Sequence, residues 1–485
     1  MPLPLTLDPL ARSNSASAAL RSIAQLPGPR GWPVVGNLPQ LRAAHIHRDM
    51  EALAAHHGAL FKIRFGRRLV LVVADHALIE TILRDRPDGF RRPAMTAQVS
   101  HEMGGRPGVF VVEGTIWRNQ RRMVMAGLAP HAVKAYFPSL VTVAQRLQKR
   151  WVVAACAGQS IALNDDLKRY SVDIIAGLAL GTASNTIEGI DDVIHQQMEV
   201  VMHAMARRSR SAVPYWRYFR LPADRRLDRS VAALRTTVTA LIAAARQRLD
   251  DEPDRRAHPR NLLEAMICAA DDPDSGVDQS AIAGNATTML LAGEDTTANT
   301  IAWMIYLMQR HPATLQRARD EVLREIPDIA AVSVAQLDAL DFLGACAQEA
   351  MRLKPVAPFM PLEALRTTTV GDVEVPAGTL VWCVMRHDSV SDRYFPRADI
   401  FDPDRWLQVG DGAANKSASM PFGAGPRTCP GRYLALLEIK LAVAMLLSSF
   451  DITALDTPDG ADACEVMGFT MAPPALRMRI RSRVP

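Results

Sequence analysis

The chain has 485 residues, and its 48% hydrophobic content is enough to build one large core. Its 56 basic and 51 acidic residues leave a net charge of +5, which is too small and too dispersed to indicate a nucleic-acid-binding protein. No run of about eighteen apolar residues occurs, so we expect a soluble protein without a membrane anchor.

Residues 1–25 are predicted to form a flexible polar arm, because no long apolar run connects their charged side chains. Residues 26–33 then read Leu-Pro-Gly-Pro-Arg-Gly-Trp-Pro, a stiff and turn-rich entry. No linker, repeat or low-complexity block interrupts the remainder, so residues 26–485 are predicted to form a single domain.

Two short β regions are predicted. Residues 60–65 and 69–73 flank Gly66-Arg67-Arg68 as a hairpin, and a second region covers 370–384. Helical periodicity covers most of the rest, over residues 115–126, 139–156, 165–180, 228–249, 279–310, 312–325, 340–353 and 430–448. The pattern predicts a mainly α protein with small β-sheets (α+β) and lacks the alternation of a doubly wound sheet.

The helix predicted over 279–310 would be about 45–50 Å long, with Asp278 as its N-cap. Its middle reads Ala292-Gly293-Glu294-Asp295-Thr296-Thr297, although a mid-helix glycine costs about 1 kcal/mol. Thr296 can bond back toward the carbonyl of residue 292 and widen the turn. An acidic patch on a surface helix is the alternative, but the flanks 289–291 and 301–308 are too apolar for it. Residues that are unfavourable in the middle of an otherwise regular helix indicate a functional site.

The segment 422–431 reads Phe-Gly-Ala-Gly-Pro-Arg-Thr-Cys-Pro-Gly and places Cys429 where a helix is predicted to begin. Free N–H groups at a helix N-terminus favour an anion, so we expect a lowered thiol pKa and a thiolate that binds a metal. A lone cysteine is more often a buried filler, but the glycine, arginine and proline residues around this one favour a ligand. The six cysteines are widely separated and describe neither a disulfide framework nor a zinc site, so we expect a reducing compartment, the cytoplasm.

The cysteine segment resembles the haem-ligand loop of the cytochrome P450 family, Phe-x-x-Gly-x-Arg-x-Cys-x-Gly, at every fixed position. The resemblance implies that haem b binds with the Cys429 thiolate as its axial iron ligand. The central helix matches the family's oxygen-activation motif, which implies proton relay by Asp295 and oxygen binding by Thr296. The residues implied to contact haem in these two segments are Ala292, Gly293, Phe422, Gly423, Arg427 and Gly431.

Trp117 and Arg121 share one helix face at i,i+4, and their N–H donors suit a carboxylate. The family places this pair, together with Arg427, on the haem propionates. Some relatives carry a further propionate arginine where this chain has Leu362-Glu363-Ala364, so the partners of the second propionate are not assigned.

Glu349 and Arg352 lie at i,i+3 on a predicted helix, and Arg405 follows in an aromatic–proline–arginine segment. An exposed i,i+3 pair of this kind contributes only about 0.2–0.5 kcal/mol. The order of these residues resembles the family's Glu-x-x-Arg pair and its later arginine. We therefore interpret all three as structural residues that hold the segment presenting Cys429.

The resemblance implies a haem-thiolate monooxygenase, an oxidoreductase that uses O2 and NAD(P)H-derived electrons to hydroxylate a lipophilic small molecule such as a fatty acid, terpenoid or steroid. No flavin- or nicotinamide-binding fingerprint follows the haem region, so we expect a separate ferredoxin or flavodoxin-type redox partner. A peroxygenase, an isomerase or a non-catalytic haem sensor are the alternatives. All three have less need of the Asp295–Thr296 pair.

Overall fold

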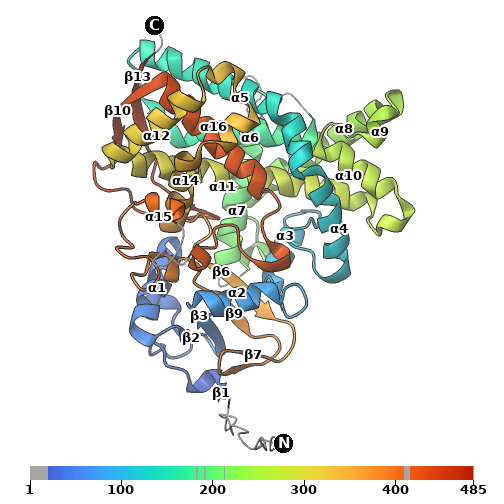
Figure 1. Cartoon of the computed structure of the whole chain (residues 1–485). Coiled ribbons are helices and arrows are strands. Elements are labelled where there is room, and N and C mark those ends of the chain that lie inside the picture. The colour runs from blue at the N-terminus through green and yellow to red at the C-terminus, as the bar shows by residue number, and fades with distance from the viewer. Residues whose placement is uncertain (1–19, 182–183, 190–192, 212–213, 409–415, 484–485) are drawn as a thin grey trace, which may run out of the picture.

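The structure is a computed structural model that describes residues 20–181, 184–189, 193–211, 214–408 and 416–483. The predicted class, mainly helical with small sheets, is confirmed (Figure 1). The helices are α1 (Ile46–His57), α2 (His76–Arg84), α3 (Ala94–Glu102), α4 (Gly114–Gly127), α5 (Pro130–Cys156), α6 (Leu163–Leu180), α7 (Val193–Arg210), α8 (Pro222–Asp251), α9 (Asp254–Ala257), α10 (Leu262–Asp271), α11 (Gln279–Gln309), α12 (Pro312–Glu325), α13 (Val334–Asp338), α14 (Asp341–Leu353), α15 (Asp404–Leu407) and α16 (Arg432–Ser449).

The largest sheet has the strand order β2-β3-β9-β6-β4 and contains the predicted hairpin. Its strands are β2 (Leu60–Phe65), β3 (Arg68–Val73), β9 (Leu380–Cys383), β6 (Met360–Ala364) and β4 (Phe90–Arg91). The register of β2 and β3 runs from Leu60 opposite Val73 to Phe65 opposite Arg68, as a tight antiparallel turn requires.

Three smaller sheets complete the β structure. Their strands are β1 (Arg21–Ser22), β8 (Val373–Val375) and β7 (Thr368–Val370) in the first; β10 (Phe450–Asp456), β13 (Arg477–Ser482) and β5 (Ile161–Ala162) in the second; and β11 (Val466–Met467) with β12 (Met471–Ala472) in the third. Figure 1 shows the largest sheet and β1 at one end of the molecule and most helices, with β10 and β13, at the other.

Helix α11 crosses the helical part and is the centre of its core. Asp278 caps it as predicted, because its carboxylate accepts from the Ala281 amide at 2.8 Å. Residues 301–308 are all buried, with Trp303 fully enclosed, as expected for a helix packed on several sides. Helix α6 packs along α11 with residues 170–180 buried. The motif at 292–297 therefore lies inside the protein and not on its surface.

The folded domain begins before residue 26, where the sequence analysis placed its first residue. Arg21 donates to the Asp372 carboxylate at 2.6 and 2.7 Å, β1 pairs with β8, and Ile23 is buried. Residues 20–25 thus belong to the folded unit, while residues 1–19 of the predicted arm lie outside the described residues. In the described part of the chain, no helix combines the length and apolar character needed to span a bilayer.

Candidate active site

The loop at residues 422–431 is closed by its own hydrogen bonds. The Cys429 amide donates to the Phe422 carbonyl at 2.9 Å, and the Thr428 hydroxyl donates to the Gly425 carbonyl at 2.7 Å. Gly425 has φ +69°, and a Cβ atom there would lie 2.6 Å from the carbonyl oxygen of Leu83 in α2. Only glycine therefore lets the loop pack against α2, and this contact fixes the position of Cys429.

Helix α16 begins at Arg432, two residues later than predicted, and Gly431 is its N-cap. The Gly431 amide and the positive charge of Arg121 lower the pKa of the Cys429 thiol, but burial raises it by more. The thiol pKa therefore lies above its ordinary value, which corrects our expectation of a lowered one. A metal that binds Cys429 has to displace the thiol proton.

Cys429 and Ala292 both keep exposed surface although each lies in a closely packed part of the protein. The Cys429 side chain has exposed surface. Burial by the surrounding protein nevertheless raises the pKa of its thiol. Ala292 is exposed in the middle of the otherwise enclosed helix α11, and it lines an apolar pocket together with Leu291. An exposed alanine at the centre of a core helix indicates space for a ligand.

The Thr296 hydroxyl donates to the Ala292 carbonyl at 2.8 Å, as predicted for a widened turn. Thr287, Thr288 and Thr300 make the same bond to the residue four positions earlier. The bond alone therefore does not distinguish Thr296. Thr296 differs from the others in its position, one turn after the exposed Ala292 and at the end of the pocket, whereas Thr287 and Thr288 line the pocket itself.

The two acids before Thr296 are held by partners from other helices that sequence reasoning missed. Lys168 of α6 lies 3.3 Å from the Asp295 carboxylate. His195 Nδ1 of α7 lies 2.7 Å from the buried Glu294 carboxylate. Burial raises the pKa of Glu294, and His195 opposes this rise. The partners are far apart in the sequence, so no local spacing could indicate them.

Gly293 faces a neighbouring helix. A Cβ atom there would lie 2.8 Å from Cγ1 of Ile175, so the glycine allows the close approach of α6 to α11. This packing explains the mid-helix glycine without a ligand, and contact of Gly293 with haem stays a prediction.

Arg86, Arg92 and Arg427 form a cationic cluster around a single carboxylate, Glu113. Arg427 pairs with Glu113 and lies over the Trp117 ring, with 4.6 Å between the guanidinium carbon and the ring centroid. Burial, together with the charge of Arg86, lowers the pKa of Arg92 to about 9, and burial lowers that of Arg427 to about 10. Buried nitrogens of Arg86 and Arg427 have no hydrogen-bond partner. Such an excess of buried positive charge fits a ligand with carboxylate groups.

The predicted pair Trp117 and Arg121 both point toward the cysteine loop. Trp117 is buried under Arg427, and Arg121 donates to the Thr428 carbonyl at 2.6 Å. At the position where relatives carry a further arginine, Glu363 instead accepts from Arg91 at 2.8 Å. Arg86 and Arg92 add positive charge beside Arg427 and Glu113, and the sequence analysis did not identify either residue.

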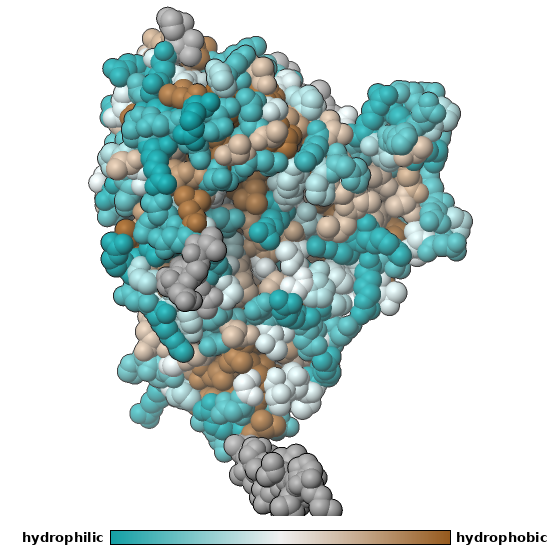
Figure 2. Space-filling view, in the orientation of Figure 1, coloured by the Kyte–Doolittle hydropathy of each residue, from teal (hydrophilic) through white to brown (hydrophobic). Residues whose placement is uncertain are grey.

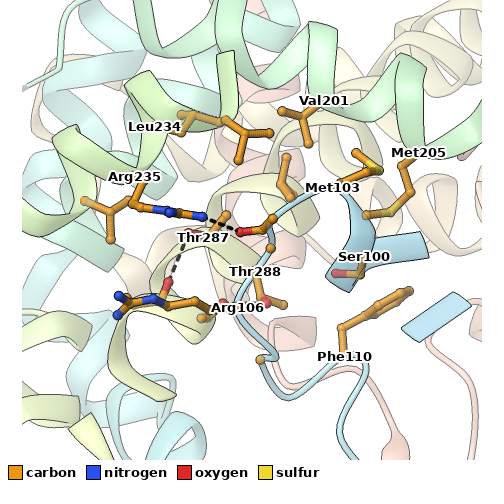
Figure 3. Close-up of a pocket in the computed structure, with 18 of the residues that line it drawn as sticks. Ser100, Met103, Arg106, Phe110, Val201, Met205, Leu234, Arg235, Thr287 and Thr288 are labelled. Carbon is orange, nitrogen blue, oxygen red and sulfur yellow. Dashed lines mark hydrogen bonds between the residues drawn. The ribbon is translucent and has the colours of Figure 1, made fainter. Parts of the chain in front are cut away.

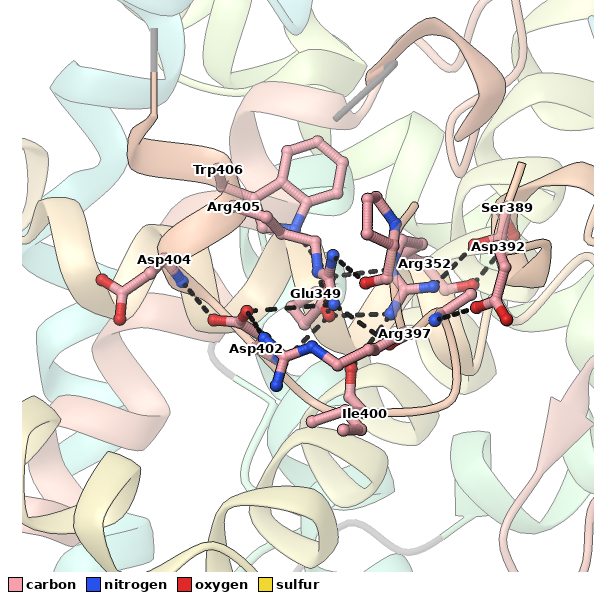
Figure 4. Close-up of polar contacts among 12 residues, drawn as sticks. Glu349, Arg352, Ser389, Asp392, Arg397, Ile400, Asp402, Asp404, Arg405 and Trp406 are labelled. Carbon is pink, nitrogen blue, oxygen red and sulfur yellow. Dashed lines mark hydrogen bonds and ion pairs between the residues drawn. The ribbon is translucent and has the colours of Figure 1, made fainter. Parts of the chain in front are cut away.

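Glu349, Arg352 and Arg405 come together in a fully buried network (Figure 4). Glu349 accepts from Arg352 at 2.8 Å through both oxygens, from Arg405 at 3.0 Å and from the Trp406 indole at 2.9 Å. Arg352 also donates to the Ser389 carbonyl at 2.6 Å.

This network connects helix α14 to the chain that leads to the cysteine loop. Lys416 donates to the Trp406 carbonyl at 2.9 Å, and Trp406 and Lys416 line one polar pocket with Phe422 and Gly423. The network therefore joins α14 to the neighbourhood of the cysteine loop, and its role in holding the segment that presents Cys429 stays a prediction.

A largely apolar pocket of about 1040 Å³, including its open mouth, lies between α3, α7, α8 and α11 (Figure 3). The residues that line it include Met103, Phe110, Val201, Met205, Leu234, Leu291 and Phe469. Arg106 and Arg235 lie on one side of the pocket, and Phe110 and the Met205 thioether on the other. Arg235 donates to the Gly104 carbonyl at 2.9 Å, and among the described residues no carboxylate pairs with either arginine.

A family model described as "Cytochrome P450" matches residues 26–479. The chain belongs to the cytochrome P450 family. It is similar to a solved structure described as the cytochrome P450DA heme domain, with TM-score 0.82 and 25% identity over 96% of this chain and 99% of that one.

Two curated relatives match over nearly the whole chain. The self-sufficient cytochrome P450 monooxygenase CYP505E1 of Aspergillus niger is 26% identical over 96% of this chain and 42% of its own length. The mitochondrial 25-hydroxyvitamin D-1 alpha hydroxylase of Mus musculus is 27% identical over 93% of this chain and 91% of its own. The chain thus spans well under half of the self-sufficient relative.

The cofactor of cytochrome P450s is haem with an axial cysteine thiolate, and the residues present fit it. Cys429 offers a thiol that keeps exposed surface. The Arg86, Arg92 and Arg427 cluster supplies the positive charge and the unpartnered nitrogens that two propionates need. Arg121 lies close enough to Cys429 to lower its thiol pKa, and therefore favours a thiolate.

Proposed function

We propose that this cytochrome P450 is a monooxygenase that uses O2 and electrons from a redox partner to hydroxylate a lipophilic small molecule. The observation that carries the proposal is the apolar pocket that reaches Ala292, one helical turn before Thr296 and Asp295. Haem bound through a thiolate supplies oxygen activation, since the thiolate favours O–O cleavage. The chain's residues then have to bind substrate, deliver protons and exclude water.

Proton delivery falls to Asp295 and Thr296. The Asp295 carboxylate is only 17% exposed and is paired with Lys168, so it is placed to move protons from the α6 side of α11. The Thr296 hydroxyl donates to Ala292 and can accept a second hydrogen bond at the ligand space. A haem sensor does not have to deliver protons, so the placement of Asp295 and Thr296 favours a catalytic function over a sensor.

The pocket favours an elongated lipophile with one polar or acidic end, such as a fatty acid. Methionine, valine, leucine and phenylalanine side chains line most of it, whereas Arg106, Arg235 and Ser100 bring polar groups to its wall. A terpenoid or steroid would use the apolar part and leave the arginines in water.

We propose a ferredoxin or flavodoxin-type redox partner that docks on the cysteine-loop side. Arg122 and Arg432 are exposed there, and Figure 2 shows that the face carrying α16 is largely hydrophilic. A partner with an acidic surface would be steered by these charges. All six cysteines are free, which agrees with a reducing compartment such as the cytoplasm.

The first test is the carbon monoxide difference spectrum of the dithionite-reduced protein. The strongly red-shifted Soret band typical of the family is expected if Cys429 is the axial thiolate, and an ordinary haem–CO band would contradict it. Fatty acids, terpenoids and steroids are then scored by the spin-state shift of haem. Product that forms only with O2, NAD(P)H and a reductase system supports a monooxygenase, whereas product with hydrogen peroxide alone indicates a peroxygenase.

A further inference from the structure

The short hairpin formed by β11 and β12 carries an aromatic side chain to the wall of the apolar pocket. Gly468, Phe469 and Thr470 connect the two strands, and Phe469 lines the pocket. The centroid of its ring lies 6.0 Å from that of Phe110, another pocket residue. Each strand has only two residues, and a two-stranded hairpin is marginally stable by itself. Contacts outside the hairpin therefore fix the position of Phe469.

One of these contacts is a buried carboxylate at the start of the hairpin. Glu465 directly precedes β11 and is 2% exposed. Three cations from other parts of the chain pair with it: Lys354, which follows α14, Arg386, which follows β9, and Arg48 of α1. The Arg386 guanidinium donates to the carboxylate at 3.0 Å. Burial alone would raise the pKa of Glu465, but these charges outweigh it and lower the pKa to about 2, so the carboxylate is ionised at neutral pH.

The cations around Glu465 are held by further contacts. Arg386 is buried and also donates to the Glu51 carboxylate of α1 at 2.8 and 2.7 Å. The Lys354 ammonium lies 5.0 Å from the centroid of the Trp303 ring, which is fully buried in α11. Hydrogen bonds between ionised groups are strong and geometrically specific, so a carboxylate shared by held cations has a defined position. The cluster therefore fixes the start of the hairpin relative to α1 and α11.

Two hydrogen bonds fix the other end of the hairpin. The Asn299 amide of α11 donates to the Thr470 hydroxyl at 3.1 Å, and Asn299 is itself buried. The Met471 backbone amide donates to the Val356 carbonyl at 2.8 Å. The hairpin is thus braced against the chain that follows α14 and against α11, just after the motif at 292–297.

We propose that Glu465 is a positioning residue that determines ligand specificity, because its ion pairs hold Phe469 at the pocket wall. Neither Glu465 nor any of its three cationic partners is among the described residues that line the pocket, so the effect on a ligand has to pass through the hairpin. A buried ion-pair cluster is a weak source of stability, since apolar residues of similar volume often stabilise a fold as well. Such a cluster supplies a defined geometry, and here that geometry ends at an aromatic ring in the pocket.

The consequence for catalysis rests on the proposed function. A lipophilic substrate in this pocket would lie against the Phe110–Phe469 pair, so the position of Phe469 would select which substrates fit and how they are oriented. The Arg48 side chain is 44% exposed, so a residue at the protein surface contributes to this selection. Ligand binding itself needs no turnover, and the positioning role can therefore be tested separately from the activity.

The test compares imidazole with 1-phenylimidazole as ligands of the haem-loaded full chain, followed by the haem absorption spectrum. The two azoles differ by one phenyl ring, so the ratio of their dissociation constants reports the fit of the pocket wall and cancels effects on haem itself. E465Q and F469A should each lower the preference for the phenyl compound by about tenfold, because the fixed ring is lost. R48Q leaves Glu465 two of its three cations and should lower the preference by about threefold.

The matched control is E321Q. Glu321 of α12 is a buried carboxylate that accepts from the Phe342 and Leu343 backbone amides at 2.8 Å, and none of these residues belongs to the hairpin or its ion-pair cluster. This substitution should lower the midpoint of urea unfolding and change the azole ratio by less than about twofold.

An unchanged ratio in E465Q together with a lowered one in F469A would overturn the proposal, since Phe469 would then keep its place without the carboxylate. An unchanged ratio in F469A, or an equal loss in E321Q, would overturn it as well. If E465Q takes up no haem, R48Q decides, and an unchanged ratio in R48Q overturns the proposal. Azole binding uses neither O2 nor electrons, so the expected ratios without any product formation would contradict only the proposed function.

Discussion

The ammonium nitrogen of Lys168 lies 3.3 Å from a carboxylate oxygen of Asp295. This contact joins α6 to the middle of α11, one residue before Thr296. It holds the carboxylate in one place without enclosing it. The neighbouring Glu294 is fully buried and paired with His195, so Asp295 is the acid of this motif with access to water.

Asp295→Asn should therefore reduce turnover by about 100-fold and leave haem binding unchanged, because an amide keeps the shape but cannot carry the proton. The measurements are kcat, its solvent deuterium isotope effect and the carbon monoxide spectrum. Asp295→Glu, which retains a carboxylate, should recover part of the rate. Equal turnover in Asp295→Asn and the parent protein would show that protons enter by another route.

Thr296→Ala should divert reducing equivalents from product to peroxide, because the hydroxyl beside the ligand space is lost. The measurement is product and hydrogen peroxide formed per NAD(P)H. Thr300→Ala is the matched control, since Thr300 makes the same 2.8 Å bond to the carbonyl four residues earlier and lies one turn away. A similar loss of coupling in both variants would assign the effect to the helix backbone and not to Thr296.

Glu349→Ala should destabilise the fold strongly, because it leaves the buried Arg352 and Arg405 without their shared carboxylate. Breaking a buried ion pair in this way costs about 3–5 kcal/mol. The measurements are urea unfolding and haem content. Glu80→Ala removes the half-buried i,i+4 partner of the exposed Arg84 and should cost less than about 0.5 kcal/mol. A stable, fully haem-loaded Glu349→Ala would refute the structural role.

The parts of the site that can be predicted from the sequence are those whose residues lie close together along the chain. The Cys429 loop, the 292–297 motif and the Glu349–Arg352 pair each lie within one element, so residue order alone brings their members together. Most of the long helices are predicted for the same reason, although α5 begins at Pro130 instead of 139 because Pro138 conceals its continuity. Helix α7 (Val193–Arg210) is not among the predicted helices. The β1–β8 pairing joins residues some 350 positions apart, which no local pattern records.

The remaining parts depend on tertiary contacts. Arg86 and Arg92 come from the segment after α2, and only the fold places them beside Arg427. The motif alone predicts contact of Gly293 with haem, whereas the close neighbour of Gly293 in the structure, Ile175, lies on another helix. The predicted lowering of the Cys429 thiol pKa is wrong, because helix geometry predicts the lowering effect of nearby N–H groups but not the burial that outweighs it.

Gly425→Ala should lower haem incorporation and stability much more than Gly423→Ala. Both glycines have positive φ, +69° and +73°, so each alanine carries backbone strain of about 1–2 kcal/mol. Only at Gly425 does the new Cβ also meet backbone, 2.6 Å from the Leu83 carbonyl oxygen, whereas open space surrounds Gly423. The measurement is the ratio of haem to protein and the urea midpoint. Equal effects would show that the contact with α2 does not position the loop.

Glu438 of α16 should make stability fall as pH rises across the neutral range. Burial raises the pKa of this carboxyl from its ordinary value of 4.5 to about 8, and a hydrogen bond with Thr297 only partly opposes the rise. The folded protein therefore keeps a proton that the unfolded chain releases. Its contribution to stability is fully present below pH 4.5 and is lost as pH rises through about 8.

The slope from one such group is about 1.4 kcal/mol per pH unit between these two values. Glu438→Gln keeps the shape and cannot ionise, so its free energy of unfolding should change less steeply with pH. The measurement is urea unfolding of both proteins at several pH values from 5 to 8. Parallel profiles would mean that Glu438 is ionised in the folded protein, and a cation or ordered water would then have to stabilise it inside the core.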